Sequence, residues 1–281
     1  MPGANEKMLM KSLSSNADSL ILDLEDAVTP DNKASAREII KDWLKSADFG
    51  SKEKTVRINP LDTPWGLDDI AIVMQGQPDA FVVPKVSTIQ ELELLDFEIT
   101  KWEKSLGYKD NSVSMILITT ETPTSILNLP TFTQCGRVNA LSWGAEDLAA
   151  ALGSSKNRRP DGTYLEIYKH CRNMTLICAS AGGVQPIDTV FVDFKDSKGL
   201  KEDCQEAAWM GYTGKMTIHP DQIDIVNTTF SPSEAEVDEA NRLVQAFEEA
   251  QRGGLMAINF DGKMVDVPPL NKAKKLLKRA K

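Results

Sequence analysis

Short runs of apolar residues recur along the chain and are separated by longer segments with helical periodicity. Seven of these runs can be interpreted as strands, at 19–24, 55–59, 80–84, 115–120, 140–143, 189–194 and 216–218. They are almost continuously apolar rather than alternating, which is typical of parallel strands covered on both faces. Helix-length segments lie between them, for example at 33–45, 88–105 and 201–210. This alternation predicts βα units around a parallel sheet.

The number of strands favours a barrel over an open sheet. Seven strands between residues 19 and 218 fit a (β/α)8 TIM barrel better than a Rossmann sheet, and no GxGxxG motif occurs. The eighth strand is expected just before Pro2 and Gly3, where the sequence begins. We therefore predict an α/β fold with a (β/α)8 TIM-barrel catalytic domain at 1–230, whose first barrel strand is apparently truncated.

The pattern changes after the last of these strands. Residues 231–234 read Ser-Pro-Ser-Glu, a capping box with proline at the first helical position. Apolar residues then recur at helical spacing up to Gly253 and Gly254. Asp261 and Gly262 form a two-residue hairpin signal, and a basic amphipathic segment follows at 270–281. We predict that residues 231–281 form a C-terminal appendage of helix and hairpin.

Composition excludes several classes of function. The 281 residues have a formal net charge of −9, which argues against nucleic acid and anionic membranes as partners. No apolar run approaches the roughly 20 residues that a membrane helix needs. The N-terminal residues resemble neither an export nor a transit signal, so we expect the cytoplasm or the mitochondrial matrix. With four unclustered cysteines and two histidines, reduced thiols are expected and a site of three imidazoles is excluded.

Polar residues follow the predicted strands, at the edge where barrel enzymes build their active sites. These segments are Asp23-Leu-Glu-Asp26, Arg57-Ile-Asn59, Pro84-Lys85, Thr119-Thr-Glu121, Trp143-Gly-Ala-Glu-Asp147 and His219-Pro220. Converging carboxylates beside one arginine would be costly without a cation between them. We therefore predict a Mg²⁺ site with Glu121 and Asp147 as ligands. The alternative is that each acid caps the helix that follows it.

Basic residues suggest further roles. The planar guanidinium group of Arg57 could bind a carboxylate or an enolate oxygen. The alternative is that Arg57 forms a structural ion pair with the acids at 23–26. Lys85 could form a Schiff base, as strand-end lysines do in some aldolases. Lys7 and Lys11 lie four residues apart on the expected first helix, where they could bind phosphate. We expect a structural hydrogen-bonding role for His219.

The motifs together are more specific than any one of them. They occur in this order over essentially the whole chain: PGANEKMLMK, LDLEDAV followed by Lys33 and Arg37, RIN, VPK, ETP, WGAEDL, GVQPIDTVFVDF, GYTGKMTIHPDQI and FDGKMVD. In these motifs the sequence resembles the citrate lyase β-subunit-like family of the HpcH/HpaI aldolase/citrate lyase superfamily, and within it the citramalyl-CoA and malyl-CoA lyases. The resemblance implies a Mg²⁺-dependent barrel that cleaves a carbon–carbon bond of a β-hydroxyacyl-CoA, giving acetyl-CoA and pyruvate or glyoxylate.

The resemblance also implies roles for individual residues. Glu121 and Asp147 correspond to metal ligands, with Glu121 also beside the substrate, and Arg57 corresponds to a substrate-binding residue. The residues expected near CoA are Lys7, Lys11, Ile187 and Asp188. Asp266 of the GKMVD motif corresponds to a catalytic acid/base that reaches a neighbouring subunit of a homotrimer. From its own surroundings, just before Val-Pro-Pro, Asp266 would be interpreted as a turn residue.

Three other functions are compatible with these motifs. The first is a malyl-CoA thioesterase, in which Asp266 would activate water against the thioester. The second is the acyl lyase (β) subunit of a citrate lyase complex, which would act on an acyl-carrier protein. The third is a non-catalytic CoA-binding or assembly protein.

Overall fold

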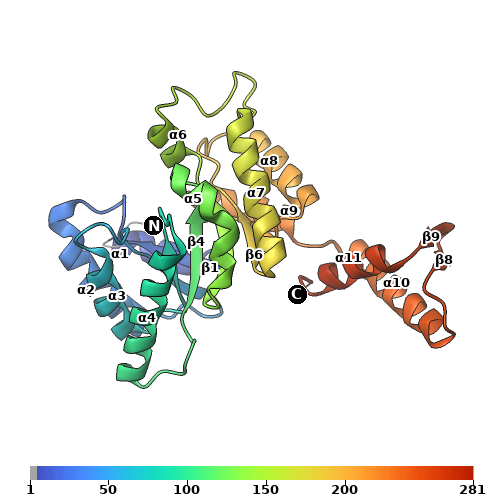
Figure 1. Cartoon of the computed structure of the whole chain (residues 1–281), viewed down its shortest axis with the longest axis horizontal. Coiled ribbons are helices and arrows are strands. Elements are labelled where there is room, and N and C mark those ends of the chain that lie inside the picture. Colours follow the sequence, from blue (N-terminus) through green and yellow to red (C-terminus); the bar gives the residue numbers. More distant parts are fainter. Residues whose placement is uncertain (1–4, 281) are drawn as a thin grey trace. The chain divides into compact units, whose positions relative to one another are not determined.

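The computed structural model describes residues 5–280 (Figure 1). The chain forms two compact units, Met1–Val226 and Asn227–Lys281. The expectation for a strand before Pro2 and Gly3 lies outside the described residues. Among the residues described, no helix is long and apolar enough to cross a membrane.

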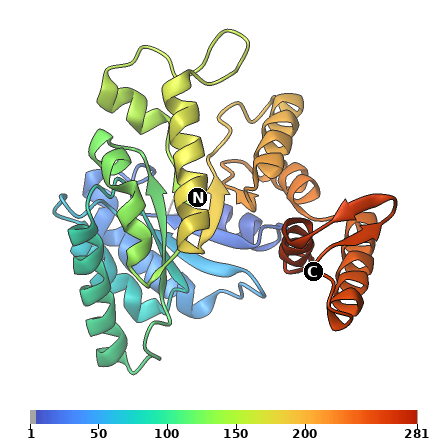
Figure 2. The same ribbon diagram turned by 45° about the vertical axis from the view of Figure 1, so that its right-hand side comes forward.

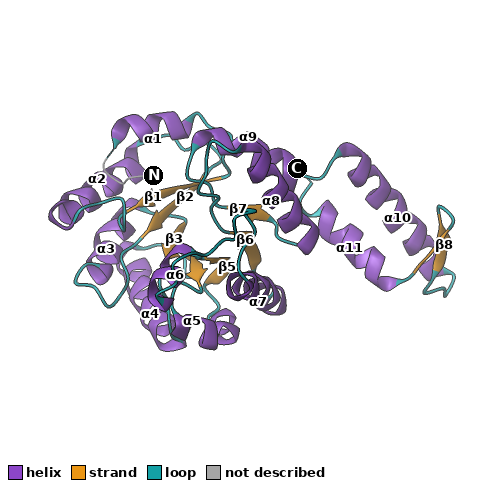
Figure 3. Cartoon of the chain, turned by 90° about the horizontal axis from the view of Figure 1, so that it is seen from above, coloured by secondary structure: helices purple, strands orange, loops and turns teal. Residues whose placement is uncertain are grey.

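The first unit is built on one parallel sheet of seven strands in the order β1-β2-β3-β4-β5-β6-β7. The strands are β1 Ser19–Asp23, β2 Glu53–Arg57, β3 Ala80–Val83, β4 Ser114–Thr119, β5 Val138–Trp143, β6 Gln185–Asp188 and β7 Gly214–Lys215. Neighbours in sequence are neighbours in space, and the sheet curves like part of a barrel wall (Figure 3). The predicted α/β fold with a parallel sheet is therefore confirmed. In the described residues β1 and β7 are the two ends of this sheet.

Helices follow the strands and cover the outer face of the sheet (Figure 3). The helices up to the boundary of the second unit are α1 Glu6–Leu13, α2 Lys33–Ser46, α3 Gly66–Val73, α4 Ile89–Leu106, α5 Pro123–Asn128, α6 Glu146–Leu152, α7 Glu166–Gly182, α8 Ser197–Met210 and α9 Ile223–Phe230. Short 3-10 helices lie at Pro30–Asn32, Met74–Gly76, Leu129–Gln134 and Pro220–Gln222. Helix α7 packs on β5 and β6 (Figure 2).

The core lies between the sheet and these helices. Strand residues that face the helices are fully buried, including Leu22, Val56, Phe81, Leu117 and Leu141. Leu9 of α1 belongs to the same cluster and anchors that helix, which leaves Lys7 and Lys11 exposed. The four cysteines are free and buried, as small apolar residues would be.

Two predicted strands are wrong in position. The sixth strand is Gln185–Asp188 rather than 189–194, and the following residues form a loop in which Val192 and Phe194 are exposed. Pro186 interrupts the apolar pattern and has no N–H, so the sequence favoured the β-branched run after it, but Pro186 pairs with Leu141 of β5. The seventh strand is Gly214–Lys215 rather than 216–218, because its register is set by Ile187 and Asp188.

The second unit contains α10 Glu234–Arg252, the antiparallel hairpin of β8 Ile258–Phe260 and β9 Lys263–Val265, and α11 Val267–Leu277. Asp261 and Gly262 both have positive φ, as this hairpin turn requires. The predicted capping box is wrong by two residues: Ser233 caps α10 and Glu236 completes the box. Phe247 and Val265 are buried in the small core of this unit.

Candidate functional site

The carboxyl ends of β1 to β5 bring together the predicted metal ligands, Arg57 and Lys85. Asp23 ends β1, Arg57 ends β2, and Lys85 lies two residues after β3. Glu121 lies two residues after β4, and Asp147 is in the first turn of α6, after β5. In a parallel sheet these ends share one edge, which is where α/β-barrel enzymes place their chemistry.

The DLED segment after β1 is a structured turn. The Asp23 carboxylate accepts hydrogen bonds from the backbone N–H groups of Glu25 (2.9 Å) and Ala27 (3.3 Å). From outside the turn, the buried Lys33 Nζ donates to the carbonyls of Leu24 and Glu25, both at 2.8 Å. This network explains why an acidic segment can be held in one conformation at the edge of the sheet.

Arg57 is bound to the acids of this turn. Its Nε and Nη2 donate to the two Asp23 oxygens at 2.8 and 2.6 Å, and Nη1 lies 2.9 Å from Glu25 Oε2. Burial opposes ionisation of Asp23, but the hydrogen bonds and charge of Arg57 outweigh it and lower the pKa of that carboxyl group. The structural ion pair considered as an alternative is therefore present, with the Arg57 side chain still 22% exposed.

Glu25 is a residue that the sequence did not single out within its motif. It is buried, and Lys85 Nζ donates to its Oε1 at 2.6 Å. Burial raises its pKa more than the charges of Arg57 and Lys85 lower it. Its Oε2 lies 2.9 Å from Arg57 Nη1. Both oxygens of this buried carboxylate are therefore paired with cationic side chains.

Glu121 is held at the end of β4 by an unusual local backbone. Thr120 has φ of 63°, a left-handed conformation that β-branched residues rarely adopt, and Thr122 caps α5 with Pro123 in the first turn. Glu121 Oε2 accepts the Lys85 backbone N–H at 2.6 Å. The carboxylate is therefore bound across the sheet rather than capping α5.

Burial and neighbouring charge raise the pKa of Glu121. Its burial, followed by the charges of Asp147 and Glu25, raises its pKa to about 8. Gly144 of the WGAED segment lies against it, because a Cβ added to Gly144 would sit 2.5 Å from Glu121 Cγ. A divalent cation beside this group would favour the ionised form.

Asp147, in the first turn of α6, is the last of the carboxylates that follow β1 to β5 at this sheet edge. Its Oδ1 lies 3.2 Å from Lys85 Nζ, and its side chain is 39% exposed. It is not the cap residue of α6, so the capping alternative is not observed for either predicted metal ligand. The described residues include no group of three His, Cys, Asp or Glu side chains arranged to hold a metal ion by themselves. Mg²⁺ commonly takes only one or two carboxylates and completes its shell with water and substrate, so the donor set fits it.

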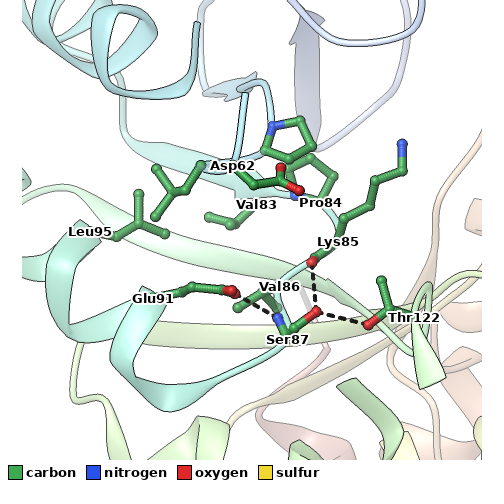
Figure 4. A pocket seen from close by; sticks show the side chains of 11 residues that line it. Asp62, Val83, Pro84, Lys85, Val86, Ser87, Glu91, Leu95 and Thr122 are labelled. Carbon is green, nitrogen blue, oxygen red and sulfur yellow. Dashed lines mark hydrogen bonds between the residues drawn. The ribbon is translucent and has the colours of Figure 1, made fainter. Parts of the chain in front are cut away.

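Lys85 does not suit the Schiff-base alternative. Its ammonium group is paired with Glu25 and Asp147, and these charges outweigh burial and raise its pKa, whereas an amine nucleophile needs a lowered one. Beside it, a pocket of about 150 Å³ is lined by Asp62, Pro84, Lys85, Ser87, Glu91 and Thr122. Figure 4 shows the Lys85 side chain pointing away from Ser87 and Thr122, whose hydroxyl groups are 2.8 Å apart.

The remaining predicted residues lie elsewhere. Asp188 ends β6 with its carboxylate fully buried, bound by Trp143 Nε1 at 2.8 Å, Lys215 Nζ at 2.7 Å and Arg172 Nη2 at 2.9 Å. Ile187 beside it is half-buried.

In the second unit, Asp266 is exposed at the N-cap position of α11, with no side-chain capping hydrogen bond. His219 has the expected structural role, because its Nδ1 accepts the Asp221 N–H at 3.3 Å.

A parallel α/β sheet of this order, with carboxylates gathered at the carboxyl ends of its strands, defines an enzyme of the barrel type with a site suited to a hard metal ion. Residues 1–220 match the family model described as HpcH/HpaI aldolase/citrate lyase. The chain belongs to this family of Mg²⁺-dependent enzymes, which includes both lyases and thioesterases of CoA thioesters.

Individual relatives have two different activities. The chain is 35% identical to a (3S)-malyl-CoA thioesterase of Cereibacter sphaeroides over 100% of the chain and 92% of that protein. It is 34% identical to the citrate lyase subunit beta of Escherichia coli K12 over 100% of the chain and 91% of that protein. Among solved structures, the CitE protein of Mycobacterium tuberculosis in complex with magnesium, acetoacetate and coenzyme A has a TM-score of 0.77 at 29% identity, covering 100% of this chain and 96% of CitE.

Proposed function

We propose that the protein is a Mg²⁺-dependent lyase that cleaves a β-hydroxyacyl-CoA, citramalyl-CoA or malyl-CoA, to acetyl-CoA and pyruvate or glyoxylate. The observation that supports this most is the placement of Glu121 and Asp147 at one sheet edge, in contact with Lys85, whose other partner Glu25 is also paired with Arg57. Such an edge combines carboxylates for a hard cation with guanidinium and ammonium groups for an anionic substrate.

Glu121 and Asp147 are the proposed ligands. When bound, Mg²⁺ would polarise the hydroxyl and carboxylate oxygens of the substrate and stabilise the developing keto acid. Arg57 is proposed to bind the substrate oxygen that gains charge, which its 22% exposure and its fixed hydrogen bonds to Asp23 support. Asp23 would then act as a positioning residue for Arg57.

The thioester is proposed to bind through residues on other elements. Lys7 and Lys11 lie exposed on one side of α1 and suit phosphate groups of CoA. Ile187 and Asp188 are the proposed neighbours of CoA on β6. Because the Asp188 carboxylate is buried among Trp143, Lys215 and Arg172, its contact with CoA would involve the backbone.

Asp266 is the proposed acid/base that returns a proton to the enolate carbon of acetyl-CoA. Asp266 is exposed, and its side chain makes no capping hydrogen bond to α11. Its carboxylate is therefore available to a ligand. We propose that residues 231–281 close the site of a neighbouring subunit in a homotrimer.

A thioesterase is the second candidate, favoured by the 35% identity to the malyl-CoA thioesterase of Cereibacter sphaeroides. In that case Asp266 would activate water against the thioester carbonyl. The similarity to the citrate lyase beta subunit also keeps the acyl lyase subunit of a complex as a candidate.

Product identification with purified protein tests the proposal. The protein is incubated with citramalyl-CoA and malyl-CoA, with and without Mg²⁺. We expect acetyl-CoA and a 2-oxo acid in equal amounts, in the presence of Mg²⁺ only. Free CoA without acetyl-CoA would favour the thioesterase, and turnover of an acyl-carrier protein substrate alone would favour the citrate lyase subunit.

A further inference from the structure

Lys85 touches both proposed metal ligands. Its backbone N–H donates to Glu121 Oε2 at 2.6 Å, and its Nζ lies 3.2 Å from Asp147 Oδ1. The residue has φ of 53°, a left-handed conformation that is strained for a non-glycine residue. One strained residue therefore connects the ends of β4 and β5 at the site.

The Lys85 ammonium group lies where several negative charges meet. It is 2.6 Å from Glu25 Oε1 and 3.9 Å from Asp26 Oδ1, in addition to Asp147. Glu25 is 3% exposed, and its other carboxylate oxygen lies 2.9 Å from Arg57 Nη1. Without a cation at this point, these carboxylates would repel one another.

The pair of Lys85 and Asp147 is open to exchange, whereas the neighbouring pairs are not. The side chains of Lys85 and Asp147 are 28% and 39% exposed, while that of Glu25 is 4% exposed. The Lys85–Asp147 distance of 3.2 Å is also longer than the 2.6 Å between Lys85 and Glu25. An ion arriving from solvent would therefore compete for Asp147 first.

We propose that the ammonium group of Lys85 is the resident cation of this site in the metal-free protein, and that a divalent metal must displace it from Asp147 in order to bind. This inference rests on the proposed function, in which Asp147 is a metal ligand. Lys85 is then an internal competitor that sets the metal affinity, and it stays paired with Glu25 after the exchange.

The proposal predicts the direction of a change in metal affinity. In Lys85→Gln the amide can still donate to Glu25, but the positive charge is lost. The metal-free site becomes more negative and Asp147 has no competitor, so Mn²⁺, used as the spectroscopic probe for Mg²⁺, should bind at least about threefold more tightly. A lysine that only holds the ligands in place would give the opposite result, because its loss would loosen the site.

The experiment measures free Mn²⁺ by electron paramagnetic resonance during titration of the wild type and variants. Lys85→Arg keeps the charge and should bind Mn²⁺ within about twofold of the wild type. Lys41→Gln is the matched control, because it removes the same charge from α2, where Lys41 pairs with Glu38 and Asp42. Lys85→Met serves as a second neutral variant if Lys85→Gln does not fold, as judged by circular dichroism.

Equal or weaker Mn²⁺ binding by the folded neutral variants overturns the displacement proposal while leaving the metal site intact. Failure of the proposed function is distinguishable from this. In that case the wild type does not bind Mn²⁺, or Asp147→Asn binds it as tightly as the wild type, and the metal site falls together with the role of Lys85.

Discussion

At the scale of single residues, the site depends on backbone conformations that side chains rarely permit. Thr120 and Lys85 both have positive φ. Thr120 directly precedes Glu121, and the Lys85 backbone N–H donates to the Glu121 carboxylate. The cost of roughly 1–3 kcal/mol for each is offset by the surrounding fold. This conformation directs the Lys85 N–H to the buried carboxyl group of Glu121, whose pKa is raised by burial and by the charges of Asp147 and Glu25.

Lys7 and Lys11 give a prediction about binding. We expect Lys7→Ala combined with Lys11→Ala to raise KM for a CoA thioester more than it lowers kcat, because phosphates far from the reacting bond contribute mainly uniform binding. Steady-state kinetics with CoA and truncated pantetheine thioesters measure the effect. The exposed pair on α4, changed as Lys101→Ala with Lys104→Ala, is the control. An equal loss with both thioesters would contradict phosphate binding by α1.

At the scale of elements, the turn between β5 and α6 must approach β4 closely. A methyl group on Gly144 would sit 2.5 Å from Glu121 Cγ, inside a buried region. We expect Gly144→Ala to lower Mg²⁺-dependent turnover by about 10- to 100-fold, because a displacement of about 1 Å at a catalytic group has that effect. Gly136→Ala, before the same strand, has no atom within 4 Å of the added methyl group and should behave as wild type. Equal activity of both variants would show that Glu121 need not lie against this turn.

The junction of α4 with β5 gives a prediction about pH. Glu103 is buried, and its Oε1 accepts Arg137 Nη1 at 2.8 Å and the Val113 N–H at 2.9 Å. Burial raises the pKa of Glu103, but Arg137 and the backbone N–H groups outweigh it, so the pKa is below its ordinary value of 4.5. The stabilisation is therefore complete above pH 4.5 and is lost as the pH falls through the folded-state pKa.

We expect Glu103→Gln to lower the free energy of unfolding by about 1–3 kcal/mol at neutral pH. Thermal melts from pH 6 to pH 3 should then fall less steeply for this variant than for the wild type. Glu98→Gln, at a partly exposed position of the same helix where Glu98 pairs with Lys101, should follow the wild type. Parallel curves for all three proteins would remove Glu103 from the acid response.

The sequence predicted the elements better than it predicted their ends. Apolar runs located β1 to β5 because each of these strands contains buried residues, and β3 is buried throughout. The sequence pattern failed at β6. Pro186 lies within this strand, whereas the run at 189–194, which looked more like a strand, is a loop with exposed apolar residues. Pairing with β5 decides that register, and pairing between distant segments is not encoded in local pattern.

The candidate site was predicted as a set of strand-end residues, without their contacts. Glu121 and Asp147 could be chosen because they follow strands, and their placement at one edge follows from parallel topology. The position of the Lys85 ammonium between Glu25 and Asp147 depends on side-chain directions across three strands. The need for Gly144 could only be found from the distance to Glu121.

At the scale of the whole molecule, the proposal assigns the active site to two chains. If a neighbouring subunit supplies Asp266, mixing inactive Asp266→Asn chains with inactive Glu121→Gln chains should restore part of the activity. Some sites in a mixed oligomer would then combine an intact sheet edge with an intact C-terminal segment. Differential tagging checks that mixed oligomers form. Mixed oligomers that form and remain inactive would contradict a site shared between subunits.

The central claim is that Glu121 and Asp147 hold the Mg²⁺ that carbon–carbon cleavage requires. The most direct measurement is acetyl-CoA formation from citramalyl-CoA and malyl-CoA as a function of Mg²⁺ concentration, for the wild type, Glu121→Gln and Asp147→Asn. We expect saturable Mg²⁺ dependence in the wild type and no turnover in either variant, with unchanged circular dichroism, because each substitution removes charge rather than core volume. Wild-type turnover in both folded variants would contradict the account.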